Sequence, residues 1–178
     1  MKKSLIFAIL AVLVCCAVVF GLSQGLDGKM SENAQKEQMR VFKLLCPGSD
    51  SFTEDPYTGS DATVSKVWKG ETGFVVETVT QGYGDAITLW VGVSTEGKVT
   101  GLTVRDSHET LGLGQQILTD HEFLAQFLDT DGTAAIGQGV DGITGATVTS
   151  KAIARCVTSA VAVVTGADVD SGATSWGG

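Results

Sequence analysis

An uninterrupted run of apolar residues opens the chain and gives way to mixed apolar and polar patterns further on. Residues 4–22 carry no charge and follow lysines at positions 2 and 3. A helix of this length reaches about 28 Å, close to the roughly 30 Å of a bilayer core. Because basic residues favour the cytoplasmic side, the pattern predicts a single transmembrane anchor over residues 1–22, with a cytoplasmic N-terminus and the remainder outside the cell membrane.

Two other uses of this run remain open. The apolar core of a cleaved signal peptide is shorter, about 7–15 residues, and ends in a small-x-small site that Gly21-Leu22-Ser23 fits. A lipid anchor on Cys15 or Cys16 is a further alternative, although the residues before them are not the small ones expected there. The length of the run favours a retained anchor.

The next segments have helical spacing and then strand alternation. Residues 27–46 place apolar side chains at helical spacing and end at Pro47-Gly48, which predicts a juxtamembrane helix within a connection over residues 23–61. Alternation then predicts four strands, over residues 64–68, 73–79, 86–93 and 99–104. Short turns separate these strands, so we expect an antiparallel meander.

Two more helices are predicted after the strands. Thr119 and Glu122 form a capping-box pattern before a helix, and a polar, glycine-rich loop follows over residues 129–139. The last helix is expected from about Thr149 to Val164, with Gly166 as its C-terminal cap. The predicted fold is therefore α+β: one exported domain over residues 62–166, with an antiparallel sheet and packed helices, and a disordered tail over residues 167–178.

Composition narrows the function. The 178 residues exclude a large multidomain enzyme, and the net charge of -8 argues against nucleic acid as a partner. Two of the four cysteines lie in the anchor, which leaves Cys46 and Cys156 either to form one disulfide or to stay as unpaired thiols. Neither their number nor their spacing indicates a bound metal.

Residues for simple acid-base or nucleophilic catalysis are missing. His108 and His121 are the only histidines, neither has a second metal ligand at a suitable spacing, and no G-x-S-x-G motif is present. His121 is expected to be a solvated surface residue at the start of a helix. We therefore predict no catalytic residue in the chain.

Two glycine-containing loops are the candidates for ligand binding, at residues 108–114 and 141–150. In the second, small residues allow close approach of the backbone, hydroxyls can donate, and the N–H groups of a helix start favour a phosphate. The same Thr and Ser residues are also ordinary helix caps, so this pattern alone leaves both interpretations open.

A family resemblance adds to this pattern. Residues 141–147 resemble the flavinylation motif D-x-x-[S/T]-G-A-T of the FMN-binding domain family, and HETLGLG at residues 108–114 resembles its H-x-E-T-P-G-L-G segment. The likeness extends to Gly82-Tyr83-Gly84 and Gln126-Phe127 and spans nearly the whole chain. In size and layout, the chain is similar to the G subunits of Rnf electron transport complexes.

The resemblance implies that FMN is joined covalently, by a phosphoester, to the hydroxyl of Thr147, and that Asp141 opens the motif. A separate flavin transferase would make this bond from FAD with a magnesium ion. Thr144, Gly145 and Ala146 would then shape the phosphate loop, and Thr149 and Ser150 would cap the helix. The residues implied to line the flavin ring are Glu109, Thr110, Leu111, Gly112 and Leu113.

Two features depart from the family pattern. Leu111 stands where the family usually has Pro, and His108 is followed directly by Glu109 where an extra residue is common. Residues 168–174 also fit the attachment motif, ending at Thr174, but no apolar helix follows them. We interpret Thr174 as a decoy or a minor site.

The function implied by the resemblance is electron transfer by a covalent FMN within a membrane complex. Such a complex moves electrons between ferredoxin and NAD and couples them to sodium or proton translocation, so the chain would be one subunit of an oxidoreductase with no complete activity of its own. Its partners would be the other subunits and, during maturation, the flavin transferase. The alternatives are a stand-alone anchored flavoprotein that serves an external acceptor and a module that binds no redox cofactor.

Overall fold

The computed structural model of the chain describes residues 32–107 and 116–167. Residues 1–40 and residues 41–178 form separate compact units, and each is described by itself. In the first unit, residues 32–40 are helical and mostly exposed, and in the second the helical conformation covers residues 41–45. The helix predicted before Pro47 is thus confirmed over residues 32–45, whereas the predicted anchor lies outside the described residues.

The second unit is built on a five-stranded antiparallel sheet in which each strand pairs with the next in sequence. Its strands are β1 (Thr53–Asp55), β2 (Val64–Lys69), β3 (Gly73–Gln81), β4 (Ala86–Ser94) and β5 (Val99–Ser107). The four predicted strands are confirmed, each one to three residues longer at its C-terminal end. β1 was not predicted, because its three residues are all exposed and form no apolar pattern.

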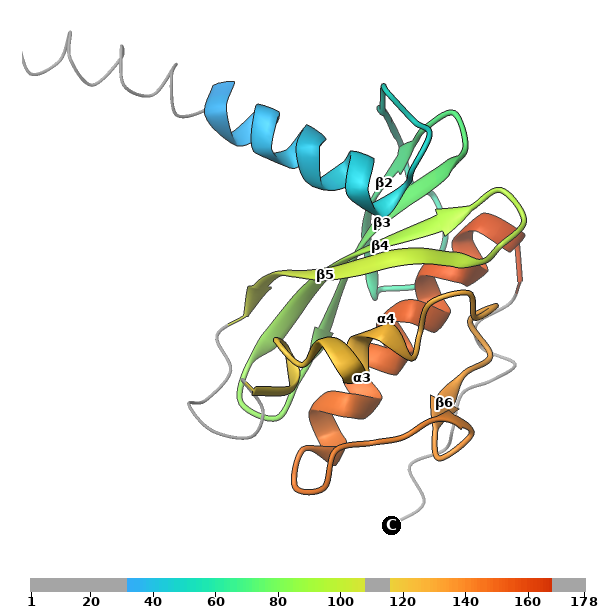
Figure 1. The fold of residues 1–178 in the computed structure, drawn as a ribbon. Coiled ribbons are helices and arrows are strands. Elements are labelled where there is room, and N and C mark those ends of the chain that lie inside the picture. Colours follow the sequence, from blue (N-terminus) through green and yellow to red (C-terminus); the bar gives the residue numbers. More distant parts are fainter. Residues whose placement is uncertain (1–31, 108–115, 168–178) are drawn as a thin grey trace, which may run out of the picture. The chain divides into compact units, whose positions relative to one another are not determined.

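Helix α4 (Thr147–Thr165) covers one face of this sheet. Figure 1 shows α4, in orange to red, lying along the sheet, and the short helix α3 (His121–Ala125) contributes Phe123 and Leu124 to the main core. Ile153, Val157 and Ala160 of α4 are at most 1% exposed and belong to the main core with Val76 and Val91 of the sheet. In the described part of the chain, only α4 is long and apolar enough to cross a membrane, but most of it is buried in the fold, as expected for a core helix.

A second apolar cluster covers the opposite face. Phe42 packs against Trp68 and Trp90 with ring centroids 4.8 and 5.0 Å apart, and Val75 and Cys46 complete the group. The sheet is thus enclosed on both faces. Because Cys46 lies in this cluster and Cys156 lies in the main core, the two buried thiols are unpaired, which excludes the disulfide alternative.

The helix boundaries differ from the sequence-based expectation in two places. The N-cap of α3 is Asp120 and not Thr119, because the Asp120 carboxylate accepts hydrogen bonds from the N–H groups of both Glu122 and Phe123 at 3.0 Å. Thr119 instead donates its hydroxyl to the carbonyl of Gln116 at 3.1 Å, in the turn before the helix. Helix α4 begins at Thr147, two residues earlier than expected, and ends at the predicted Gly166 cap.

The predicted loop over residues 129–139 contains a small second sheet. β6 (Ala135–Ile136) and β7 (Gly139–Val140) pair in parallel, with Ala135 opposite Gly139. Strands of two residues leave no periodic pattern in a sequence, so they could not be predicted. They lie directly before the segment that leads into α4.

Candidate functional site

The start of α4 presents a hydroxyl group to solvent. Ala146 is the N-cap residue and supplies no side-chain hydrogen bond to the helix, and the first turn contains no acidic side chain. Thr147, the first helical residue, is exposed. The partial positive charge at the start of a 19-residue helix therefore lies beside an accessible Thr147 hydroxyl.

Thr149 and Ser150 do not occupy the N-cap position of α4, contrary to the prediction that they cap the helix. Both lie inside the first turn of α4 and are 0% exposed. The Ser150 hydroxyl points back along the helix and donates to the Ala146 carbonyl at 2.9 Å. The N-cap residue lies directly before the first turn, and the early start of α4 gives that position to Ala146.

A tight turn precedes the helix. The Ala146 N–H donates to the Ile143 carbonyl at 3.0 Å, which closes a four-residue turn. Gly145 takes a φ of 85° at its third position, where residues other than glycine are strained. Ile143 is half-buried and Ala146 is 5% exposed, whereas Thr144 and Gly145 are exposed. The structure thus brings Thr144, Gly145, Ala146 and Thr147 together in one short arch, which follows the half-buried Ile143 and is held in the core by Ala146.

A side chain that the sequence analysis did not single out as a site residue holds the other end of this segment. The backbone N–H of Asp141 donates to Gln126 Oε1 at 2.7 Å, and Gln126 Nε2 donates to the Asp141 carbonyl at 3.5 Å. Gln126 is the C-cap residue of α3 and is half-buried. Residues 126 and 141 are linked by no sequence periodicity, so only the structure reveals this contact.

The connection from α3 to β6 is tied to both the sheet and α4. Val99 of β5 exchanges backbone hydrogen bonds with it, accepting from Asp129 at 2.9 Å and donating to Thr130 at 3.0 Å. Thr158 of α4 donates to the Gly132 carbonyl at 2.8 Å. The segment that leads toward the arch therefore starts from a rigid base.

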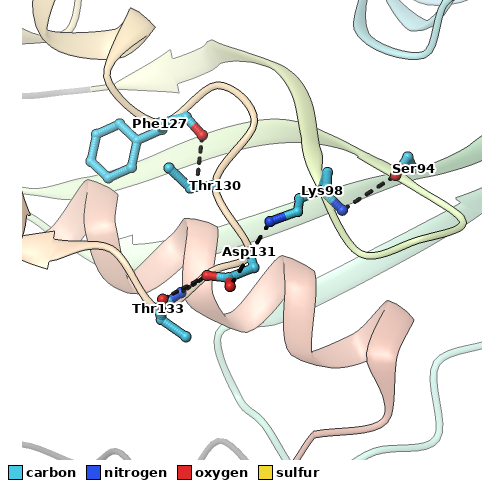
Figure 2. A network of polar contacts seen from close by, with 6 residues as sticks. All are labelled: Ser94, Lys98, Phe127, Thr130, Asp131 and Thr133. Atoms are coloured by element: carbon cyan, nitrogen blue, oxygen red, sulfur yellow. Dashed lines mark hydrogen bonds and ion pairs between the residues drawn. The ribbon is translucent and has the colours of Figure 1, made fainter.

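Figure 2 shows the polar network at this base. Asp131 accepts hydrogen bonds from the Thr133 hydroxyl and the Thr133 N–H, at 2.6 and 3.2 Å, and lies 3.9 Å from Lys98 Nζ. The hydrogen bonds from Thr133, and secondarily the charge of Lys98, hold the pKa of Asp131 below its usual value. The ionised carboxylate thus accepts both hydrogen bonds from Thr133 at the start of the segment that leads to β6.

The remaining predicted residues have different outcomes. The residues expected to line the flavin ring, Glu109, Thr110, Leu111, Gly112 and Leu113, lie outside the described residues, as do His108 and Thr174. Ser107 at the end of β5 pairs with Ile87, close in sequence to the turn between β3 and β4. His121 is exposed at the start of α3, as predicted, and the described residues contain no cluster of three potential metal ligands.

Comparisons with known proteins cover the part of the chain that contains the candidate site. The family model of the FMN-binding domain matches residues 82–162, which contain both glycine loops and most of α4. The G subunit of the proton-translocating ferredoxin:NAD(+) oxidoreductase complex of Clostridium ljungdahlii is 30% identical, over 85% of this chain and 83% of the relative. The G subunit of an ion-translocating oxidoreductase complex of Methanosarcina acetivorans is 34% identical, over 71% of this chain and 74% of the relative.

Proposed function

Since the chain belongs to the family of G subunits of ion-translocating oxidoreductase complexes and contains its FMN-binding domain, we propose that it is an electron-transfer subunit with FMN bound covalently to Thr147. The observation that carries this proposal is the exposed Thr147 hydroxyl at the start of α4. A helix start stabilises the negative charge of a phosphate group.

The residues around Thr147 fit a phosphate ester. Lys151 lies one turn further along the same face of α4, where a positive charge favours a bound phosphate. Thr144, Gly145 and Ala146 form the arch beside the hydroxyl and leave room there, because their side chains are small. The helix start, the neighbouring cation and the small residues are independent features that favour the same chemistry.

We expect attachment to occur by transfer from FAD, catalysed by a separate flavin transferase with magnesium. A bond forms between Thr147 Oγ1 and the phosphorus on the FMN side of FAD, the diphosphate bond breaks, AMP leaves, and the threonine proton passes to a base of the transferase. Once attached, FMN supplies the redox chemistry. The chain holds the phosphate at the start of α4, and residues 109–113 are proposed to contact the ring.

The proposed setting is a membrane complex. Two of the relatives are named as G subunits of ferredoxin:NAD(+) oxidoreductase complexes. The complex of Clostridium ljungdahlii is named proton-translocating, and that of Acetobacterium woodii is named Na(+)-translocating. We infer that this chain works beside the other subunits of such a translocase, held by a single N-terminal helix with its flavin domain outside the cytoplasm. A stand-alone anchored flavoprotein is the alternative, and co-purification with multispanning subunits separates the two.

Thr147→Ala and Thr147→Val test the attachment directly. Both should abolish flavin fluorescence in a denaturing gel and remove the mass of one FMN less one water from the intact protein. The fold should survive, since the Thr147 side chain is exposed. The matched control is Thr174→Ala in the second motif, which should keep both readouts. Fluorescence that persists in Thr147→Ala and disappears in Thr174→Ala would place the flavin on the other motif.

A further inference from the structure

The contact between Gln126 and Asp141 links the end of α3 to the first residue of the attachment motif. We propose that Gln126 is a positioning residue, whose side-chain amide holds Asp141 so that the arch presents Thr147 to the flavin transferase. The inference rests on the proposed function, because it assigns a role in the same reaction. Gln126 touches neither the hydroxyl nor any reacting atom, so it acts only through the backbone of the segment.

Gln126 is itself well fixed. Its backbone N–H donates to the Phe123 carbonyl at 3.2 Å at the end of α3. Phe123 and Phe127 on either side are 2% and 0% exposed, and their rings pack edge to face with centroids 5.4 Å apart. The amide therefore starts from a backbone position held by the core.

The segment that it holds has few other restraints. Between Asp141 and Ala146 no residue belongs to a helix or strand. Gly142 and Gly145 give the chain more conformational freedom than other residues would, so ordering this stretch costs more entropy. A hydrogen bond at Asp141 and the buried Ala146 anchor limit that freedom from opposite ends.

Local packing also fixes the backbone on either side of Asp141. Val140, directly before Asp141, is 1% exposed, and a Cβ atom added to Gly142 would lie 2.7 Å from Ile136 Cγ2. The backbone of this segment therefore continues from β7 at Val140, contacts Gln126 at Asp141 and lies against Ile136 of β6 at Gly142. The 2.7 Å bond from the Asp141 N–H is the stronger of the two contacts, because 3.5 Å is at the limit for a hydrogen bond.

Gln126→Met tests this role in the full-length protein. Methionine has a similar length but cannot accept the Asp141 N–H. Gln126→Glu keeps the acceptor oxygen. Gln138→Met is the matched control, since Gln138 is exposed in the turn between β6 and β7 and forms only backbone hydrogen bonds within the described residues. The two measurements are amide hydrogen exchange of residues 141–147 and the kinetics of flavin transfer by purified flavin transferase with FAD and magnesium.

In Gln126→Met we expect exchange of the hydrogen-bonded Asp141 and Ala146 amides to accelerate by about three- to tenfold, the range that one net hydrogen bond provides. The KM of the transferase for the chain should rise by a similar factor with kcat unchanged, because a smaller fraction of molecules presents the segment correctly. Gln126→Glu should stay close to wild type in the exchange of the Asp141 amide, and Gln138→Met in both readouts. The thermal unfolding midpoint should change little, since the freed N–H reaches water.

Unchanged exchange, or an unchanged KM despite faster exchange, would overturn the proposal. A fall in flavin transfer that merely follows a lowered unfolding midpoint would also overturn it, because that result indicates a structural role alone. If Gln126→Met does not fold, Gln126→Asn provides the same readouts with the amide drawn back by one methylene. Exchange requires no flavin, so a wild-type chain that accepts no flavin on Thr147 would overturn the proposed function separately.

Discussion

Three consecutive residues at the start of α4 meet three different physical requirements. Gly145 takes a φ of 85°, which disfavours side chains. Ala146 is 5% exposed, so a larger side chain would have to displace its neighbours. Thr147 is exposed and is the first residue of the helix. The three residue types thus fit a turn, a buried contact and an exposed position, in that order along the chain.

Asp61, which precedes β2, connects stability to pH. Burial by itself raises the pKa of its carboxyl, but the nearby Ser159 hydroxyl, the Thr63 N–H that donates at 2.8 Å, and the charge of Arg155 outweigh it and lower the pKa from 3.8. The Ser159 hydroxyl lies near this carboxylate without a well-aligned hydrogen bond. A depressed pKa stabilises the fold above the unfolded value, and this contribution disappears as the pH falls through the folded value.

We therefore expect the free energy of unfolding to fall as the pH drops below about 3.8, and Asp61→Asn to weaken this dependence. The variant should be less stable than wild type at pH 7, and the difference should shrink in acid. Urea unfolding followed by tryptophan fluorescence at several pH values measures this. Parallel pH profiles for the two proteins would contradict the assignment.

At the scale of single residues, the sequence predicted that Thr147 is exposed, but it did not predict the contact between Gln126 and Asp141. The attachment motif marks Thr147 through its neighbours in the chain, which is local information. The Gln126 contact joins positions 15 residues apart through a side chain and a backbone N–H, and such a contact leaves no pattern in the sequence. The inward turn of the Ser150 hydroxyl was missed because Ser is equally common as a cap.

At the scale of elements, the N-cap of α3 gives a direct comparison between two neighbouring residues. Asp120→Ala should lower the free energy of unfolding by about 1 kcal/mol, because two helix N–H groups lose their acceptor. Thr119→Ala should cost less, since its hydroxyl only donates to the Gln116 carbonyl at an exposed position. Urea midpoints of the two variants measure the difference. A larger loss in Thr119→Ala would restore the capping box that the sequence favoured.

The elements that the sequence predicted well are the longer strands and the long helix, which contain several apolar residues each. β2, β3, β4 and α4 each contain several buried side chains, and β5 has a buried Val99 followed by five half-buried residues. α3 has only five helical residues, so its boundaries depend on which of two adjacent polar side chains reaches the N–H groups. β1, β6 and β7 owe their pairing to position in the fold and not to composition.

At the scale of the whole molecule, the predicted orientation in the membrane can be tested at β1. All three residues of β1 are exposed, so a cysteine in place of Asp55 should react with a membrane-impermeant maleimide on intact cells. Background labelling should be low, because Cys46 and Cys156 are buried and burial raises the pKa of Cys156 to about 12. Labelling that requires permeabilised cells would reverse the orientation and contradict flavin transfer outside the cytoplasm.

The overall architecture was predictable because neighbours in the sheet are neighbours in the chain. The sequence did not predict that both faces of the sheet are covered. Val75 and Val76 are adjacent and both fully buried, which breaks the alternation expected of a strand with one solvent-facing side. Only the structure shows that one of them contacts the aromatic cluster around Phe42 and the other the α4 core.

The order of elements along the chain also sets an order of assembly. Synthesis proceeds from the N-terminus, so β2 to β5 can pair before α4 exists to cover their inner face. The arch gains its anchor at Ala146 only when α4 packs, since Ala146 belongs to the core that α4 completes. A flavin transferase that recognises the arch would then act on the folded domain. On the proposed function, we therefore expect flavin only on copies in which α4 has packed against the sheet.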